Sequence, residues 1–372
     1  MNRFAFLIHP LDIRRDVARR YPWAARLPEW VLEALLRILK PQVLGKIEGV
    51  RSPFAETEGW LIGVPMTPKG LLTDEKRSLP LLLRACQMAQ QMGAQIVGLG
   101  AFTAIAGGKG KWLADHSPIP VTTGNSYTVA TALEATVTAA KWMGHNLSDS
   151  TVAIVGATGS IGRSCGVLIG EGSWSVNSDS GKAVPRQLIL IGRNPDLLQK
   201  IKAEIGDDGC PEVVTTTNLR EGLKQADIIL ACSSSVAPII EPADLKPGAV
   251  VCDVARPRDV SEKVRDLRDD VLVIDGGIVE VPGSPRWQFS IGLPSHLTLA
   301  CVAETMLLAL EGKVKESYTV GPEIRSDYVR EMAALAHRHG FRVSGLRSFE
   351  QVLDSEKVEA IRRKAQALRT AR

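Results

Sequence analysis

The hydrophobic pattern between residues 150 and 290 consists of short apolar runs separated by polar or glycine-rich segments. The runs read TVAIV, LILI, ADIILA, AVVCDV and VLVI, and each is followed by small or polar residues. Uninterrupted apolar runs of this length are typical of parallel strands covered on both faces. The pattern therefore predicts an α/β fold, with a doubly wound parallel sheet of the Rossmann type in this part of the chain.

The first 125 residues alternate strand-like and helix-like segments. Strands are predicted at RFAFLI, EGWLIGV and QIVGLGAF, and a helix at PLLLRACQMAQQMG. A further helix is predicted over residues 27–41, between Pro28 and Pro41. Its apolar stripe comprises Trp30, Val31, Ala34, Leu35 and Ile38. We expect the stripe to pack into the core, and the alternative is an interfacial or acyl-covering surface.

Three regions follow from this pattern. Residues 1–125 are predicted to form a small α/β domain that binds the substrate. Residues 126–312 are predicted to comprise a hinge helix ending at Gly144 and the Rossmann domain, and residues 313–372 a helical, charged C-terminal tail. The Ser/Gly-rich residues 171–185 are expected to be a surface insertion.

The composition limits the function classes. Hydrophobic residues make up 45% of the chain and its net charge is +4, which fits a globular protein and gives no sign of nucleic-acid binding. No apolar run reaches the roughly 18 residues of a membrane span, and the N-terminal FAFLI is too short for a signal peptide. We therefore expect a cytoplasmic protein. The six cysteines lack zinc-site spacing, so reduced thiols and no metal site are expected.

Basic residues are concentrated near both ends of the chain. The N-terminal group comprises Arg14, Arg15, Arg19, Arg20 and Arg26, and the C-terminal group comprises Arg362, Arg363, Lys364, Arg369 and Arg372. Two interpretations remain open. These residues form solvated helix faces, or they form a docking surface for an acidic partner or an anionic lipid surface.

A glycine-rich turn follows the first strand of the predicted Rossmann domain and opens a helix. Its candidate cofactor-binding residues are Gly156, Thr158, Gly159, Ser160, Ile161 and Gly162. Glycines at such a turn let the backbone approach a dinucleotide pyrophosphate, and the helix N-terminus attracts the negative charge.

The end of the second strand indicates which dinucleotide binds. Arg193 and Asn194 stand there instead of a carboxylate, and a guanidinium suits the 2′-phosphate of NADPH. Ser233 and Ser234, after ADIILAC, are predicted to lie beside the nicotinamide ribose. Gly276, at the end of the last strand, is predicted to leave room for the nicotinamide ring.

The segment LPSHLTLACVAETMLLALEG, residues 293–312, is predicted to be a helix, with Ser295 as its N-cap and His296 in its first turn. Its apolar stripe on a helical wheel comprises Leu299, Val302, Met306 and Leu310. Cys301 lies off that stripe, and its neighbours on the wheel are Leu297, Thr298, Glu304 and Thr305. This half-polar face indicates a cleft, but the spacing alone favours a buried inert thiol over a catalytic one.

Several separated blocks resemble the cyanobacterial long-chain acyl-[acyl-carrier-protein] reductases, which make fatty aldehydes. The blocks are FLIHP, GLGAFTAI, TTGNSYTVA, TVAIVGATGSIG, LILIGRN, ADIILACSS, IDGGIVE and ACVAETMLLALEG. In that family the cysteine of the last block is the acylated nucleophile, and it corresponds to Cys301. The resemblance implies that the Cys301 thiolate takes the acyl group from its carrier, that NADPH reduces it, and that aldehyde leaves.

The resemblance also implies partners and supporting residues. The substrate donor would be acyl carrier protein or acyl-CoA, and a further enzyme would consume the aldehyde. Asn125 and Ser126 are candidate oxyanion donors, with helix capping as the alternative role. His296 is a candidate for proton transfer, with an exposed or capping residue as the alternative. Basic termini and an apolar product leave a peripheral membrane contact open.

Two other functions fit the same architecture. A shikimate- or quinate-type dehydrogenase needs a Lys/Asp pair in the N-terminal domain. The sequence shows no persuasive pair, because Lys69, Lys109 and Lys111 lie in predicted loops. A non-catalytic NADP-binding protein is the other. The N-terminal stretch up to Pro41 and the insertion at 171–185 depart from the cyanobacterial pattern, which leaves the acyl length and the carrier open.

Overall fold

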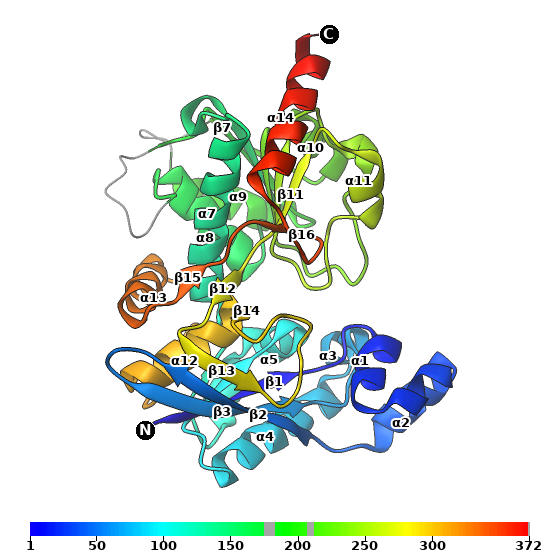
Figure 1. The fold of residues 1–372 in the computed structure, drawn as a ribbon, viewed down its shortest axis with the longest axis vertical. Helices are drawn as coiled ribbons and strands as arrows, with labels where there is room; N and C mark the ends of the chain where they lie inside the picture. The colour runs from blue at the N-terminus through cyan, green and yellow to red at the C-terminus, as the bar shows by residue number, and fades with distance from the viewer. Residues whose placement is uncertain (175–182, 207–211, 371–372) are drawn as a thin grey trace. The chain divides into compact units, whose positions relative to one another are not determined.

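The computed structural model describes residues 1–174, 183–206 and 212–370 (Figure 1). The chain divides into two compact units. The first comprises Met1–Asn125, Val279–Pro322 and Leu335–Arg342, and the second comprises Ser126–Ile278, Glu323–Ala334 and Val343–Arg372. Most of the predicted insertion, residues 175–182, lies outside the described residues, as does Cys210.

The elements of the first unit alternate as its sequence predicts. In chain order they are β1 (Arg3–Ile8), α1 (Ile13–Arg20), the 3-10 helix η1 (Pro22–Arg26), α2 (Glu29–Ile38), β2 (Gln42–Arg51), β3 (Glu56–Gly63), α3 (Pro68–Thr73), α4 (Glu75–Gln91), β4 (Ile96–Leu99), η2 (Ala101–Ala104), α5 (Ala106–Lys109), α6 (Lys111–His116), β5 (Val121–Thr122), β13 (Gly283–Trp287), β14 (Leu297–Leu299) and α12 (Ala300–Glu311).

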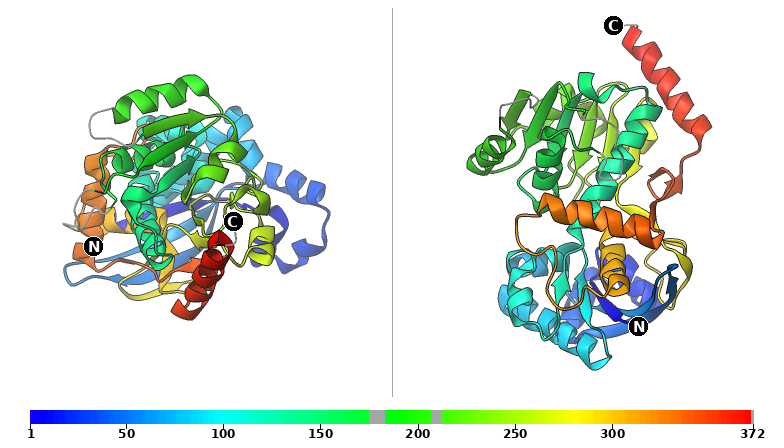
Figure 2. Two further views of the ribbon diagram at one scale, coloured as in Figure 1. Left: turned by 90° about the horizontal axis from the view of Figure 1, so that it is seen from above. Right: turned by 90° about the vertical axis from the view of Figure 1, so that its left-hand side faces the viewer.

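A mixed sheet in the order β13-β2-β3-β1-β4-β5 forms the centre of the first unit. The neighbours β3, β1, β4 and β5 run parallel, and β2 and β13 extend the sheet antiparallel. Ala5 and Leu7 of β1 face the core cluster that includes Leu82 and Cys86 of α4. Alternate residues point the other way, toward α12, which lies against β1, β3 and β4 (Figures 1 and 2). Helices therefore cover this sheet on both faces.

Helix α2 confirms the predicted helix between Pro28 and Pro41, but the predicted apolar stripe is not its buried face. Leu32 and Leu36 are buried, and they pack with Ile13 of α1 and Ala24 of η1. Trp30 and Ile38, which were expected in the core, are 71% and 76% exposed. Both faces of this helix carry apolar residues, so the periodicity alone selects the wrong one.

The second unit contains the predicted Rossmann sheet. Its elements are α7 (Asn125–Trp142), η3 (Leu147–Asp149), β6 (Thr151–Val155), α8 (Ser160–Gly170), β7 (Gln187–Ile191), α9 (Pro195–Ile205), β8 (Glu212–Thr216), α10 (Leu219–Gln225), β9 (Ile228–Ala231), η4 (Pro242–Asp244), β10 (Val250–Asp253), α11 (Glu262–Leu267), β11 (Leu272–Asp275), β16 (Arg347–Ser348), β17 (Gln351–Val352) and α14 (Ser355–Thr370). Three elements are divided between the two units, with some residues in each: β12 (Ile278–Glu280), α13 (Ser326–His339) and β15 (Arg342–Val343).

All neighbouring strands of this sheet are parallel, in the order β11-β10-β9-β6-β7-β8. This is the strand order of a dinucleotide-binding Rossmann fold, with the topological switch point between β6 and β9. One face of the sheet packs in a cluster that includes Ala153, Ile189 and Val251, and the other packs against α7 and α14. The protein therefore has an α/β fold with a Rossmann-type domain.

Two expected boundaries differ from the observed units. Residues 279–312 were assigned to the Rossmann domain, but α12 packs on the sheet of the first unit. The C-terminal region was expected to be helical throughout, but β15 and the hairpin β16–β17 separate α13 from α14. Every helix within the described residues is too short or too polar to cross a membrane.

Candidate active site

A close approach between α12 and the sheet places Cys301. A Cβ atom on Gly98 of β4 would collide with Thr305 Oγ1 of α12 and with the ring of Phe6. Glycine at this position therefore lets the helix lie against the strand. Cys301 is one turn before Thr305, whose hydroxyl donates to the Cys301 carbonyl at 3.1 Å.

The turn after β5 meets the first turn of α12. A Cβ atom on Gly124 would lie 2.5 Å from the Cβ and 2.6 Å from the carbonyl oxygen of Cys301. Gly124 also has a φ of +72°, a conformation that side chains disfavour. Both the backbone conformation and the contact require glycine here, which explains the TTGN sequence of this turn.

Helix α12 begins later than predicted, and this changes the setting of Cys301. Residues Leu297–Leu299 form β14, and the helix begins at Ala300, so Cys301 is its second residue. Ser295 is therefore not its N-cap. The backbone N–H groups at a helix N-terminus favour a thiolate over a thiol. Within α12, all of whose residues are described, Cys301 is the one partly exposed residue before Glu311.

The polar face around Cys301 is buried, which corrects the expectation that it lines a cleft. Glu304 and Thr305 have no exposed surface. Glu304 Oε1 accepts hydrogen bonds from Thr122 Oγ1 at 2.6 Å and from Thr319 Oγ1 at 2.8 Å. Thr122 Oγ1 in turn accepts from the Gly124 N–H at 3.1 Å. This buried network ties the turn after β5 to α12, next to Cys301.

The other predicted catalytic residues occupy different settings. Asn125, which follows Gly124, is half-buried and is the first residue of α7, and the buried Ser126 is the second. Both lie inside the helix, so neither occupies the N-cap position that was the alternative role for them. His296 is exposed in the turn before β14, where its carbonyl accepts from the Val281 N–H at 2.9 Å. Its expected place in the first turn of the Cys301 helix is therefore wrong.

Sequence reasoning missed two buried polar residues near Cys301 in the chain. Glu304 appeared only as part of a polar helix face, because glutamate is rarely buried completely. Thr298 Oγ1, three residues before Cys301, is one of four buried side-chain polar atoms that lack a hydrogen-bond partner among the described residues. No feature of the sequence marks Thr298 as unusual, since strand threonines are common.

In the second unit, the glycine-rich turn lies at the switch point of the Rossmann sheet. Gly156 follows β6 with a φ of +78°, and a Cβ atom on it would lie 2.8 Å from Ser233 Cα, which follows β9. A Cβ atom on Gly162 would collide with the backbone of Gly156. These two glycines let the turn, α8 and the neighbouring strand end pack together.

The start of α8 fits a dinucleotide pyrophosphate. The helix begins at Ser160 after Gly159, and among the described residues no side chain caps its N-terminus. Within 4 Å, a Cβ atom on Gly159 would meet two atoms of the described residues, the carbonyl oxygens of Gly156 at 3.1 Å and Cys232 at 3.8 Å. Thr158 and Ile161 flank this position and are partly exposed. The helix N-terminus is thus approachable by a phosphate group, as such sites require.

The other residues that were expected to bind the cofactor differ in their exposure and in their contacts with the protein. Arg193 is exposed after β7, whereas Asn194 caps α9 by accepting from the Leu197 N–H at 3.1 Å. The Ser233 hydroxyl donates to Asp259, and Ser234 is exposed. A Cβ atom on Gly276 would lie 2.7 Å from Cys252 Sγ, so packing against protein already explains this glycine.

The remaining described cysteines are poor candidates for a nucleophile. Burial raises the pKa of Cys86 and of Cys252 to about 12. A hydrogen bond with Cys165, together with burial, holds the pKa of Cys232 well above its usual range. A thiol in such a setting stays protonated at neutral pH and is a weak nucleophile.

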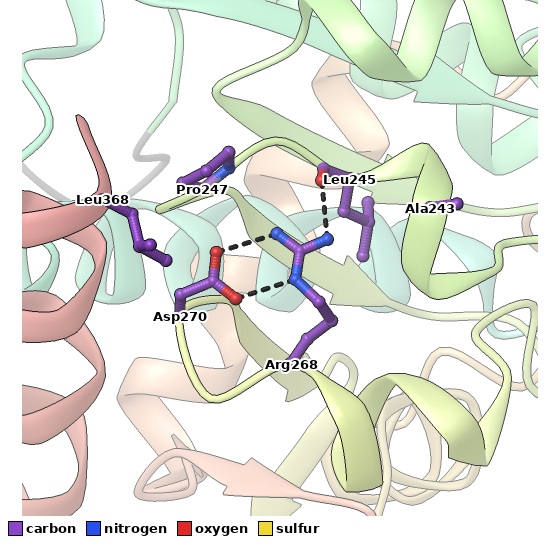
Figure 3. A pocket seen from close by; sticks show the side chains of 6 residues that line it. All are labelled: Ala243, Leu245, Pro247, Arg268, Asp270 and Leu368. Carbon is purple, nitrogen blue, oxygen red and sulfur yellow. Dashed lines mark hydrogen bonds and ion pairs between the residues drawn. The ribbon is translucent and has the colours of Figure 1, made fainter. Parts of the chain in front are cut away.

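The second unit contains a cavity of about 350 Å³. Figure 3 shows its lining residues, which are Ala243, Leu245, Pro247, Arg268, Asp270 and Leu368. The Arg268 guanidinium donates to both carboxylate oxygens of Asp270 and to the Leu245 carbonyl. The two charged residues that line the cavity are therefore paired with each other. None of the predicted site residues lines the cavity.

Comparison with known proteins identifies the family. The long-chain acyl-[acyl-carrier-protein] reductase of Synechococcus elongatus is 30% identical over 352 residues, which cover 89% of this chain and 95% of the reductase. The chain belongs to the family of this reductase. The chain is thus a member of an NAD(P)-dependent oxidoreductase family.

Other matches cover parts of the chain or of the relative. The family model described as shikimate/quinate 5-dehydrogenase matches residues 138–275, which lie in the second unit. Aminotransferase PigE of Serratia sp. is 31% identical over 319 residues, which cover 83% of this chain, and the chain spans 35% of the length of PigE. A crystal structure of shikimate 5-dehydrogenase from Listeria monocytogenes is 11% identical, with 89% of this chain and 96% of that chain covered, at a TM-score of 0.36.

Proposed function

We propose that the protein reduces a long-chain acyl thioester to the aldehyde, with Cys301 as the nucleophile that carries the acyl group. The observation that carries the proposal is the setting of Cys301. It is a partly exposed thiol at the N-terminus of a buried helix, and the Gly124 turn is packed against its backbone. Membership in the acyl-[acyl-carrier-protein] reductase family supports the same residue and the same reaction.

The first half of the reaction is acyl transfer. The Cys301 thiolate attacks the carbonyl carbon of the acyl thioester, and the bond between that carbon and the carrier sulfur breaks. The carrier leaves as a thiol after it takes up a proton, and the acyl group becomes a thioester of Cys301. Backbone N–H groups at the start of α12 and the half-buried Asn125 are the donors that we assign to the oxyanion. His296, exposed before β14, is assigned no step.

The second half of the reaction is reduction. A nicotinamide nucleotide, when bound, supplies a hydride to the acyl carbonyl carbon. The carbonyl oxygen takes up a proton to give a thiohemiacetal of Cys301, which loses that hydroxyl proton as its carbon–sulfur bond breaks. The aldehyde leaves, and the sulfur returns to the thiolate that the helix N-terminus favours. Overall, one hydride and one proton are consumed for each aldehyde and each carrier thiol released.

For the cofactor we propose NADPH, held by the turn at residues 156–162 and selected by Arg193. The exposed guanidinium at the end of β7 suits a 2′-phosphate, and the sequence has no carboxylate there to bind the two ribose hydroxyls of NADH. For the acyl donor we propose acyl carrier protein, with acyl-CoA as the other candidate. An enzyme that consumes an aldehyde would act on the product.

The shikimate/quinate family model supports a second candidate, an alcohol dehydrogenase reaction on a small hydroxy acid. The match covers residues 138–275 and leaves out Cys301 and the whole first unit sheet. The match therefore supports nucleotide binding by the second unit and carries no information on the substrate. A non-catalytic NADP-binding protein would share the same match.

A turnover assay separates these candidates. Purified protein is mixed with a long-chain acyl thioester and NADPH, and carrier thiol release, NADPH oxidation and aldehyde are measured together. The proposal predicts equal amounts of all three with wild type and none with Cys301→Ser, whereas Cys86→Ser in the same unit retains activity. NADP-linked oxidation of shikimate or quinate without thioester turnover would instead support the dehydrogenase.

A further inference from the structure

The exposed side of α2 carries an apolar ridge. Trp30, Ala34 and Ile38 are spaced four residues apart, so they lie on one side of the helix over about 12 Å of its length. Trp30 is 71% and Ile38 is 76% exposed. We call these three residues the α2 ridge. Two further apolar side chains flank it in the sequence, Trp23 at 59% exposure and Leu39 at 36%.

The ridge is not the side that holds α2 in the fold. Leu32 and Leu36, on the opposite side, pack with Ile13 and Ala24 and fix the helix against α1 and η1. Single exposed apolar residues are ordinary, but an aligned set that includes one tryptophan and has a second nearby in the sequence marks an interaction surface. Figures 1 and 2 show α1 and α2 projecting from the rest of the first unit, beyond the end of β1.

The segment that contains the ridge carries many exposed basic residues. Residues 11–40 contain seven basic and four acidic residues and carry a net charge of +3, whereas the whole chain carries +4. All seven basic side chains are exposed: Arg14, Arg15, Arg19, Arg20, Arg26, Arg37 and Lys40. Of the four carboxylates, Asp16 is partly buried and pairs with Arg15 and Arg19. Residues 11–40, the segment that contains the ridge, therefore have a net charge close to that of the whole chain.

We propose that the α2 ridge docks on the headgroup region of an anionic lipid bilayer. Trp30 and Ile38 enter the boundary between headgroups and acyl chains, and the arginines of residues 11–40 contact the lipid phosphates. Tryptophan is the side chain most typical of this boundary, and an apolar ridge bordered by basic residues is the pattern of helices that lie in it. This docking does not depend on the proposed reaction.

Vesicle flotation with the full chain tests the proposal. We expect the protein to float with vesicles of phosphatidylcholine and phosphatidylglycerol, and to remain unbound with phosphatidylcholine alone. Trp30→Gln with Ile38→Gln should lower the partition coefficient at least about tenfold, because both parts of the ridge are lost. Arg26→Glu with Arg37→Glu should lower it by a similar factor, and salt should weaken the wild-type binding.

A matched control separates the ridge from exposed apolar residues in general. Leu267 and Val352, at 68% and 61% exposure, lie in the second unit, and Leu267→Gln with Val352→Gln should leave flotation unchanged. Circular dichroism and thermal melting confirm that each variant is folded. Unchanged flotation of the Trp30/Ile38 variant, or an equal loss in the control pair, overturns the proposal. So does vesicle-independent binding of an acidic acyl carrier protein that only the Arg26/Arg37 variant loses.

Discussion

Thr122 donates a hydrogen bond of 2.6 Å to Glu304 across 182 residues of chain, and both side chains are completely buried. The same carboxylate oxygen accepts from Thr319. The Glu304 side chain therefore connects α12, the turn after β5 and the segment around Thr319. The arrangement fixes the backbone on both sides of Cys301.

Removal of Glu304 should destabilise the first unit. Glu304→Ala leaves two buried hydroxyls without an acceptor and opens a cavity, which should lower the free energy of unfolding by about 3–5 kcal/mol. Thr122→Val in the same chain should show a coupling energy of about 1–2 kcal/mol with Glu304→Ala in a double-mutant cycle. Urea denaturation measures both. Glu280→Ala, at an exposed position, is the control, and an equal effect of the two alanine substitutions would refute the role of Glu304.

Gly124→Ala should be more harmful than an alanine at another glycine with positive φ. Both Gly124 and Gly321 have left-handed backbone, but a Cβ atom on Gly321 would meet nothing within 4 Å. Gly321→Ala should therefore cost only the backbone strain, about 1–2 kcal/mol. The collision with Cys301 should add about 2 kcal/mol or more to Gly124→Ala. Similar unfolding free energies of the two variants would show that the contact with Cys301 is not tight.

His9 should make the protein less stable in weak acid. Burial lowers the pKa of His9 from 6.5 to about 4, and its Nε2 accepts a hydrogen bond from the Phe102 N–H at 3.2 Å. At a pH between these two values, His9 binds a proton in the unfolded chain but not in the folded protein. Stability is therefore complete above pH 6.5 and falls by about 3 kcal/mol as the pH decreases to 4.

Replacement of the imidazole isolates this effect. His9→Gln has no titrating ring, so its unfolding free energy should fall less than that of wild type by about 3 kcal/mol over the same pH range. His116→Gln, at an exposed position, should follow the wild-type curve. Parallel curves for wild type and His9→Gln would mean that His9 titrates equally in the folded and unfolded states.

Arg193 should determine the choice between the two nicotinamide nucleotides. Without its guanidinium, Arg193→Ser should bind NADPH about ten- to a hundredfold more weakly and bind NADH as wild type does, because only NADPH carries the 2′-phosphate. Fluorescence titration measures both dissociation constants. Lys200→Ser, an exposed position on α9, is the control. Equal losses for the two nucleotides would place Arg193 elsewhere in the site.

The parts of the fold that the sequence predicts are those with an unambiguous pattern. The strands β6, β7, β9, β10 and β11 are continuous apolar runs, and each is completely or almost completely buried. The turn at residues 156–162 was found because glycines follow a strand and open a helix. Both signals are local, so a single sequence is enough to detect them.

The errors arise where long-range contacts decide. Pro294 is followed by six residues without a helix breaker, so the pattern predicts that the Cys301 helix begins there. The structure instead has the strand β14 before the helix. Glu304 is buried because Thr122 and Thr319 reach it, and no local pattern carries that information. The choice between Leu32 and Trp30 as the buried side of α2 likewise depends on Ile13 and Ala24.

Capture of the acyl group on Cys301 is the most direct test of the proposed reaction. The protein is incubated with a long-chain acyl thioester in the absence of NADPH, and the intact mass is measured. Wild type and Cys86→Ala should both gain the mass of one acyl group, which NADPH should then remove as aldehyde. Cys301→Ala should gain none. An acyl adduct that persists in Cys301→Ala, or no adduct on wild type while NADPH still reduces the thioester, would contradict the account.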